Sequence, residues 1–136
     1  MKTYKVIFHV DELDKWKLLL KNVSNLLDAI DDNEYSIEVL ANSEAVKFYD
    51  SNFNSDISVI EKLNSNGVKF VACNNALIAN KIKSEDLIYV IEVVPVGVLE
   101  LINKQSEGYA YIKPYAALLG CVNMVYILRR IIIIFK

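Results

Sequence analysis

The sequence predicts an α/β protein with three layers, in which helices cover both faces of a five-stranded parallel sheet. Five short runs rich in strand-forming residues alternate with segments whose apolar residues recur every three or four positions. The 136 residues, 54% of them hydrophobic, suit one domain of common size. Strands that alternate with helices pair in parallel, because right-handed crossovers place the helices on the two faces of the sheet.

Three strand–helix units are expected in the first part of the chain. The strands are predicted at residues 5–10, 36–41 and 68–73. The first helix has Asp11 or Asp14 as its expected N-cap. Its apolar stripe consists of Leu13, Trp16, Leu20, Val23, Leu27 and Ile30. The second crossover is expected as two helical pieces at 44–49 and 57–63, and a short third helix contains Ala76, Leu77 and Ile82.

The next part of the chain contributes two more strands. A capped turn at 84–87, a strand at 88–94, a helix at 95–106 and a strand at 109–112 are expected in this order. Pro95 suits the first helical position, where its missing N–H would have no partner. We expect this helix to bury Val98, Leu101 and Ile102, and Gly108 to end it in a left-handed conformation. The domain is predicted to span residues 1–114.

An apolar C-terminal tail at residues 115–136 follows the domain. It contains an apolar stretch at 115–128, including Cys121, and a β-prone run at 131–135. The first stretch is shorter than the roughly 20 residues that cross a bilayer. Packing on the domain or between subunits is therefore preferred to a membrane anchor, and packing also explains Cys121.

Composition excludes several classes of function. The net charge is −2, and Lys and acidic residues are interspersed, so there is no basic stripe for nucleic acid. Two cysteines and no apolar leader favour reduced thiols in the cytoplasm. The sequence has no His/Cys cluster with metal-ligand spacing, no paired carboxylates and only four glycines. We therefore predict no metal site and no bound cofactor.

Cys73 is the strongest candidate for chemistry. Open parallel sheets bind ligands outside the carboxyl ends of their strands, and these ends carry His9, Asn42, Cys73, Pro95 and Lys113. Cys73 also precedes a helix, whose first N–H groups have no partners and favour a thiolate. The alternative is a small buried side chain that happens to end a strand.

The neighbouring polar residues have two interpretations each. His9 would serve as a base or ion-pair partner of Cys73 only if the strand order brings them together, and is otherwise structural. Asn42 and Asn74 can donate hydrogen bonds to a sulfur anion, but asparagine at such junctions commonly caps a helix or makes a turn, and this second interpretation is favoured.

Several segments together resemble the DsrE/DsrF-like sulfur-relay family, in its small stand-alone branch. The matching segments occur in order between residues 3 and 114, at 22–27, 39–43, 67–77, 94–98 and 105–114. The resemblance implies a parallel three-layer fold, assembly into trimers or hexamers, and a cysteine that carries persulfide sulfur between donor and acceptor proteins. Cys73 occupies the matching position. Asn25, Asn75 and Lys113 lie in the matching segments and join His9, Asn42 and Asn74 as supporting residues.

Two functions therefore remain open. The first is a cytoplasmic sulfur carrier, or a relative of one, that works through Cys73 in a homo-oligomer. The second is a non-catalytic oligomeric module that binds a small ligand or supports assembly, with a structural cysteine. Many stand-alone members of the family have no established activity, so the resemblance implies the fold more strongly than the function.

Overall fold

A computed structural model describes residues 2–115 and confirms the predicted fold class. The strands are β1 (Thr3–Val10), β2 (Glu34–Ala41), β3 (Val68–Cys73), β4 (Glu92–Val94) and β5 (Ala110–Ile112). The α-helices are α1 (Trp16–Ile30), α2 (Ser58–Ser65), α3 (Asn74–Ala79) and α4 (Gly97–Ser106). Three 3₁₀ helices are η1 (Leu13–Lys15), η2 (Ser43–Tyr49) and η3 (Ser84–Asp86). The predicted tail lies outside the described residues, so its boundary at residue 114 stays a prediction.

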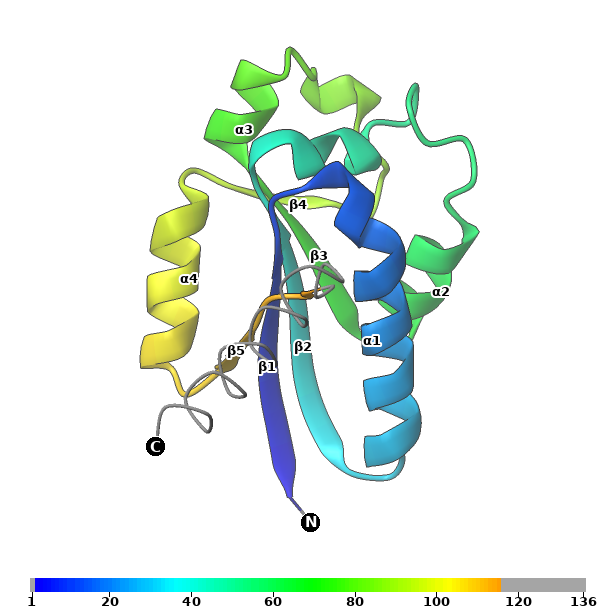
Figure 1. Cartoon of the computed structure of the whole chain (residues 1–136), viewed down its shortest axis with the longest axis vertical. Coiled ribbons are helices and arrows are strands. Elements are labelled where there is room, and N and C mark those ends of the chain that lie inside the picture. The colour runs from blue at the N-terminus through cyan, green and yellow to red at the C-terminus, as the bar shows by residue number, and fades with distance from the viewer. Residues whose placement is uncertain (1, 116–136) are drawn as a thin grey trace, which may run out of the picture.

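All five strands are parallel, in the order β4-β3-β2-β1-β5. Val10 pairs with Ala41, which pairs with Ala72, and Cys73 pairs with Val94. Because of this register, the carboxyl ends of the four strands β1 to β4 meet at one edge. Figure 1 shows α3 and η2 above this edge.

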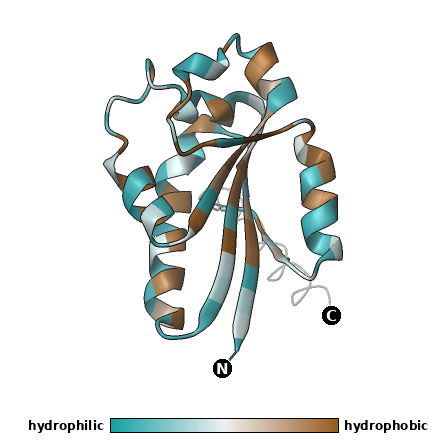
Figure 2. Ribbon diagram, turned by 180° about the vertical axis from the view of Figure 1, so that it is seen from behind, coloured by the Kyte–Doolittle hydropathy of each residue, from teal (hydrophilic) through white to brown (hydrophobic). Residues whose placement is uncertain are grey.

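The two faces of the sheet are covered unequally. In Figure 1, α1 and α2 lie on one side of the sheet and α4 lies alone on the other. Alternate strand residues such as Val6, Phe8 and Val39 join the larger core with Trp16 of α1. On the face under α4, a small cluster contains Ile7, Leu40, Val71 and Leu101. Figure 2 shows that the carboxyl halves of the central strands are the hydrophobic halves.

Helix α1 confirms the predicted stripe but not its cap. Trp16, Val23 and Ile30 are buried, while the other predicted stripe residues are partly buried against the core. The chain enters α1 through η1, and Lys15 is the N-cap residue without a side-chain cap. Asp11 and Asp14 are therefore not caps of α1. The carboxylate of Glu44 in η2 instead accepts the Leu13 N–H at 3.2 Å, which links the start of the first crossover to η2.

An aromatic cluster fixes η2 against the sheet. The Trp16 ring stacks on Phe48 with a centroid distance of 4.6 Å and packs edge-on against Tyr49 at 5.1 Å. The Trp16 indole N–H donates to the Ala45 carbonyl at 2.8 Å, and the Tyr49 hydroxyl donates to the Val39 carbonyl at 3.1 Å. The helical piece predicted at 44–49 is present as a 3₁₀ helix. Its rigid attachment holds the Asn42–Ser43 junction beside the end of β3.

The fourth strand is shorter than predicted. Only Glu92–Val94 pairs with β3, whereas residues 88–91 cross outside the sheet. Ile88 is buried there, and its N–H donates to the Tyr49 carbonyl at 2.9 Å. A run that is apolar apart from Glu92 therefore combines a packed connection with a strand. The third helix also ends early, because Lys81 adopts a φ of 57° and leaves Ile82 outside α3.

Helix α4 begins two residues later than predicted. Val96 is extended, with a φ of −137°, so the first helical residue is Gly97 rather than Pro95. Leu101 is buried as expected, but Val98 and Ile102 are 59% and 54% exposed. The prediction that all three are buried was wrong, because α4 packs on the sheet with one narrow row of side chains. Gly108 has a φ of 91° and follows the end of the helix, as predicted.

Candidate functional site

A cavity of about 490 Å³ lies at the carboxyl ends of β2 and β3. Its walls come from the β2–η2 junction, helix α3 and the start of α4. The lining residues are Asn42, Ser43, Glu44, Cys73, Asn75, Ala76, Ala79, Asn80, Val96, Gly97 and Val98. The cavity occupies the edge at which open parallel sheets bind ligands, and it contains the predicted cysteine.

Cys73 lies at the start of α3 and next to the start of α4. It is the last residue of β3 and the N-cap residue of α3, with an extended backbone. Its free thiol belongs to a side chain that is only 7% exposed. The backbone N–H of Gly97, the first residue of α4, donates to the Cys73 sulfur at 3.3 Å. The sulfur therefore faces the amino end of a ten-residue helix, where N–H groups stabilise negative charge.

The approach of α4 to Cys73 requires glycine at position 97. A Cβ atom there would lie 3.0 Å from the Cys73 Cβ, 3.4 Å from its sulfur and 3.6 Å from the Asn42 Cβ. The backbone of Gly97 is not in the left-handed region, so contact and not conformation demands glycine. Sequence reasoning missed this role. The signal was a glycine three residues beyond the end of a strand, where a closely approaching backbone is common.

His9 reaches the cavity only through Asn42. Strand β2 lies between β1 and β3, so His9 and Cys73 are on strands that do not pair. The His9 ring is buried; its Nε2 lies 2.9 Å from the Asn42 Oδ1, and its Nδ1 lies 2.7 Å from the Tyr111 hydroxyl. Both ring nitrogens are hydrogen-bonded. The geometry does not place His9 as a direct base for Cys73.

The asparagines have different positions. Asn42 precedes η2 but makes no side-chain cap, because its side-chain oxygen is bonded to His9 instead. Asn42 thus occupies the N-cap position of η2, as the favoured interpretation expected, but its side chain does not make the capping hydrogen bond. Asn74 and Asn75 are the exposed first residues of α3, and Asn75 lines the cavity whereas Asn74 does not. The N-cap position of α3 belongs to Cys73, so Asn74 is not a cap residue either.

Two predicted supporting residues lie away from the cavity. Asn25 is exposed in the second half of α1, which covers the opposite face of the sheet and runs away from the site. Lys113 follows β5, and its ammonium group contacts the Asp11 carboxylate at 3.0 Å. The hydrogen bond that Lys113 donates to the Asp11 carboxylate raises the pKa of Lys113. The structure brings neither residue to Cys73.

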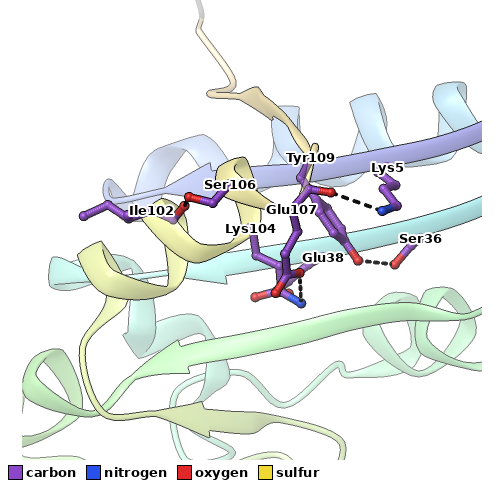
Figure 3. A network of polar contacts seen from close by, with 8 residues as sticks. All are labelled: Lys5, Ser36, Glu38, Ile102, Lys104, Ser106, Glu107 and Tyr109. Atoms are coloured by element: carbon purple, nitrogen blue, oxygen red, sulfur yellow. Dashed lines mark hydrogen bonds and ion pairs between the residues drawn. The ribbon is translucent and has the colours of Figure 1, made fainter.

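A polar network holds the other end of α4 on the sheet (Figure 3). The Lys5 ammonium donates to the Glu107 carbonyl at 3.1 Å, and the Tyr109 and Ser36 hydroxyls are 2.6 Å apart. Glu38 is buried beneath α4, 3.7 Å from the Lys104 ammonium. With Gly97 at one end and this network at the other, α4 is fixed at both ends.

Glu38 is an unusual carboxyl group. One of its oxygens, Oε1, is buried without a hydrogen-bond partner among the described residues. Burial, and after it the neighbouring Glu100 carboxyl group, together raise the pKa of Glu38 to about 7. Sequence reasoning found no carboxylate pair, because Glu38 and Glu100 meet only when α4 lies on β2.

Residues 2–115 contain neither a candidate metal site nor a helix that could span a membrane. No group of three or more His, Cys, Asp or Glu side chains there is arranged to hold a metal ion. In the same region, no helix combines the length and the apolar character needed to cross a membrane.

Comparison with known proteins identifies the family. The model of the DsrE/DsrF-like family matches residues 18–114. The solved structure of MTH1491 from Methanobacterium thermoautotrophicum, titled as a protein of unknown function, is 34% identical and superposes with a TM-score of 0.74. The match covers 82% of this chain and 99% of that one. No curated protein matches significantly. The chain belongs to the DsrE/DsrF-like family.

Proposed function

We propose that this protein is a sulfur carrier that receives persulfide sulfur on Cys73 and passes it to an acceptor thiol. One observation carries the proposal: the Cys73 sulfur lines a cavity and accepts a hydrogen bond from the first N–H of α4 at 3.3 Å. Membership of a sulfur-relay-like family supports the same class of chemistry. The donor and acceptor would be thiol-bearing proteins whose reacting sulfur enters the cavity.

The proposed transfer is an exchange between sulfur atoms. The Cys73 thiolate attacks the outer sulfur of a donor persulfide, forms a new S–S bond, and releases the donor as a thiolate with the electron pair of the broken S–S bond. An acceptor thiolate then attacks the outer sulfur on Cys73 and releases the Cys73 thiolate. Each step exchanges one S–S bond for another, so no external oxidant or reductant takes part.

Mass spectrometry of the intact protein and its peptides tests this proposal. The protein is incubated with a cysteine desulfurase and cysteine, which together supply persulfide. We expect a mass increase of one sulfur atom on the peptide that contains Cys73, reversed by a reductant and absent in Cys73→Ser. Asn74→Ser is the matched control, since Asn74 is adjacent to Cys73 but does not line the cavity. No sulfur on Cys73 in a folded protein would contradict the proposal.

A small-ligand-binding or assembly module is the second candidate. The low exposure of Cys73 and the complete hydrogen bonding of His9 favour this alternative, because both are typical of structural residues. Alkylation of the native protein separates the two candidates. A carrier thiol reacts in the folded state, whereas a structural thiol reacts only after unfolding.

We also propose that the protein works as a cytoplasmic homo-oligomer, a trimer or hexamer as its family resemblance implies. The chain offers a suitable surface, which we call the α4 surface: the exposed side chains of Val93, Val96, Val98, Leu99 and Ile102. It combines the outer side of α4 with edge strand β4 and the segment between them. Burial of this surface against a second copy would remove exposed apolar area beside the Cys73 cavity.

A further inference from the structure

Asn42 is the cavity residue whose orientation the rest of the fold controls. It lies at the end of β2, and its side-chain oxygen is 2.9 Å from the Nε2 of the buried His9. His9 is in turn 2.7 Å from the hydroxyl group of Tyr111 on β5. Tyr111 of β5, His9 of β1 and Asn42, which directly follows β2, therefore form a chain of hydrogen bonds that ends at the cavity.

The chemistry of the three groups gives this chain a direction. The Asn42 oxygen can only accept, so the Nε2 of His9 must carry a proton. In the neutral imidazole, Nδ1 is then an acceptor, and the Tyr111 hydroxyl donates to it. Tyr111 thus donates to His9, and His9 donates to Asn42. No residue between positions 2 and 115 accepts a hydrogen bond from the Asn42 amide nitrogen, Nδ2.

The other two amides in the described cavity wall are different. The Asn80 amide nitrogen donates to the carbonyls of Ser43 and Ala76, at 3.1 and 2.8 Å, so its donors are used within the fold. Asn75 is exposed on α3, and no described residue holds its side chain. Asn42 therefore combines a fixed orientation with unused N–H donors at the cavity.

The cavity contains few other groups that could stabilise negative charge, so the Asn42 donors matter. Its described lining contains no Lys, Arg or His, and its one carboxylate, Glu44, already accepts the Leu13 N–H. Among the described lining residues, negative charge on a group bound to Cys73 can be stabilised by backbone and amide N–H groups and by the Ser43 hydroxyl. The Gly97 N–H already serves the Cys73 sulfur itself.

We propose that His9 and Tyr111 are positioning residues that fix Asn42 as a hydrogen-bond donor for an anionic group bound at Cys73. This inference rests on the proposed carrier function, in which that group is the outer sulfur of the persulfide. The Gly97 N–H holds the inner sulfur and the Asn42 amide holds the outer one. The cavity then favours an anionic persulfide sulfur over a neutral disulfide partner of the same size.

Alkylation of Cys73 tests the role of Asn42 without any sulfur transfer. Iodoacetate and iodoacetamide have similar size and differ in charge. The ratio of the iodoacetate rate to the iodoacetamide rate therefore reports how well the cavity accepts an anion. Asn42→Asp keeps the oxygen that contacts His9 and replaces the donor with an acceptor. We expect this ratio to fall about tenfold, as loss of a hydrogen bond to a charged group predicts. Damage to the fold would change both rates together.

Asn75→Asp is the matched control, because it places the same charge in the same cavity on a side chain that His9 does not hold. We expect a clearly smaller fall in the ratio. Tyr111→Phe removes only the hydroxyl group that orders His9, and should lower the ratio about twofold to threefold. An unchanged ratio in Asn42→Asp, or equal falls in Asn42→Asp and Asn75→Asp, would overturn the proposed donor role.

A second readout connects Asn42 to the carrier. If the Cys73 persulfide forms, its lifetime should be shorter in Asn42→Asp than in Asn75→Asp, because the outer sulfur has lost its donor. Equal lifetimes would contradict the inference and leave the carrier function standing. If Cys73 takes up no sulfur in any variant, the carrier function fails, whereas the alkylation ratio still decides the role of Asn42.

Discussion

At the scale of single residues, Gly97 and Cys73 depend on each other. The space at position 97 is limited by the Cys73 Cβ atom, 3.0 Å from where a side chain would begin, and the same approach brings the Gly97 N–H to the sulfur. A larger residue at 97 would force the start of α4 away from β3. The hydrogen bond to sulfur would then be lost along with the packing.

Gly97→Ala should therefore be destabilising, although alanine ordinarily favours a helix. We expect a loss of about 1–3 kcal/mol in the free energy of unfolding, as in other overpacked sites. We also expect altered Cys73 alkylation. Denaturant unfolding and thiol kinetics measure the two effects. Val98→Ala is the control on the same turn, because Val98 is exposed, and equal behaviour of the two variants would show that the contact is unimportant.

The raised pKa of Glu38 predicts that the stability of the fold depends on pH. Its pKa in the folded protein is about 7, against an ordinary value of 4.5, so the folded state binds the proton more tightly. The stabilisation is complete below pH 4.5 and is lost as the pH rises through 7. The loss is about 3 kcal/mol for a shift of this size.

This loss appears as a step in the curve of unfolding free energy against pH. The step should disappear in Glu38→Gln. Urea unfolding at several pH values between 4 and 8 measures it, roughly the window in which the group titrates. Glu107→Gln is the control, since Glu107 contacts the same Lys104 from an exposed position. A step that persists in Glu38→Gln would assign the pH dependence to another group.

At the scale of the elements, the sequence predicts a boundary correctly where a local change of residue pattern marks it. The boundaries of β3 agree with the prediction because a buried run ends sharply between Gly67 and the polar Asn74–Asn75 pair. β4 does not agree, because the run at 88–94 is apolar apart from Glu92 and periodicity alone cannot separate its packed connection from its strand. The start of α4 is set by contact with Cys73, which is distant in sequence.

Helix α4 contributes few buried side chains, so each matters for the site. Leu101 is its one buried side chain in the small cluster under the helix. We expect Leu101→Ala to cost about 2–5 kcal/mol. Because α4 covers Cys73, native-state alkylation should also become faster. Ile102→Ala is the control, as Ile102 is 54% exposed on the same helix. An alkylation rate that Leu101→Ala leaves unchanged would show that α4 does not limit access to the thiol.

The residues of the site that lie at strand ends could be predicted from the sequence. Cys73 and Asn42 end predicted strands and line the cavity. Tyr111 and the meeting of Glu38 with Glu100 were not predictable, because they require the strand order and the placement of α4. Asn25 and Lys113 came from matching segments of sequence, and the fold places them away from Cys73.

At the scale of the whole molecule, the two faces of the sheet differ in how completely they are covered. One face carries α1 and α2 over a large core, whereas the other carries α4 (Figures 1 and 2). The outer side chains of α4 are exposed. The α4 surface is the place where the proposed oligomer would gain most apolar burial.

Ile102→Glu should therefore reduce the oligomer to smaller species, because it places a charge in the α4 surface. Size-exclusion chromatography with light scattering measures the mass in solution. Val59→Glu is the control, because Val59 is similarly exposed on α2, on the opposite side of the sheet. A wild-type monomer, or an oligomer that Ile102→Glu leaves intact, would contradict assembly through this surface.

The central claim is that Cys73 both receives sulfur and gives it up. The most direct measurement is a pulse–chase with isotope-labelled sulfur: Cys73 is loaded from a persulfide donor, the donor is removed, and an acceptor thiol is added. Mass spectrometry follows the label. A carrier predicts label first on the Cys73 peptide and then on the acceptor, with neither step in Cys73→Ser. Label that never reaches Cys73, or that stays there in the presence of acceptor, would contradict the account.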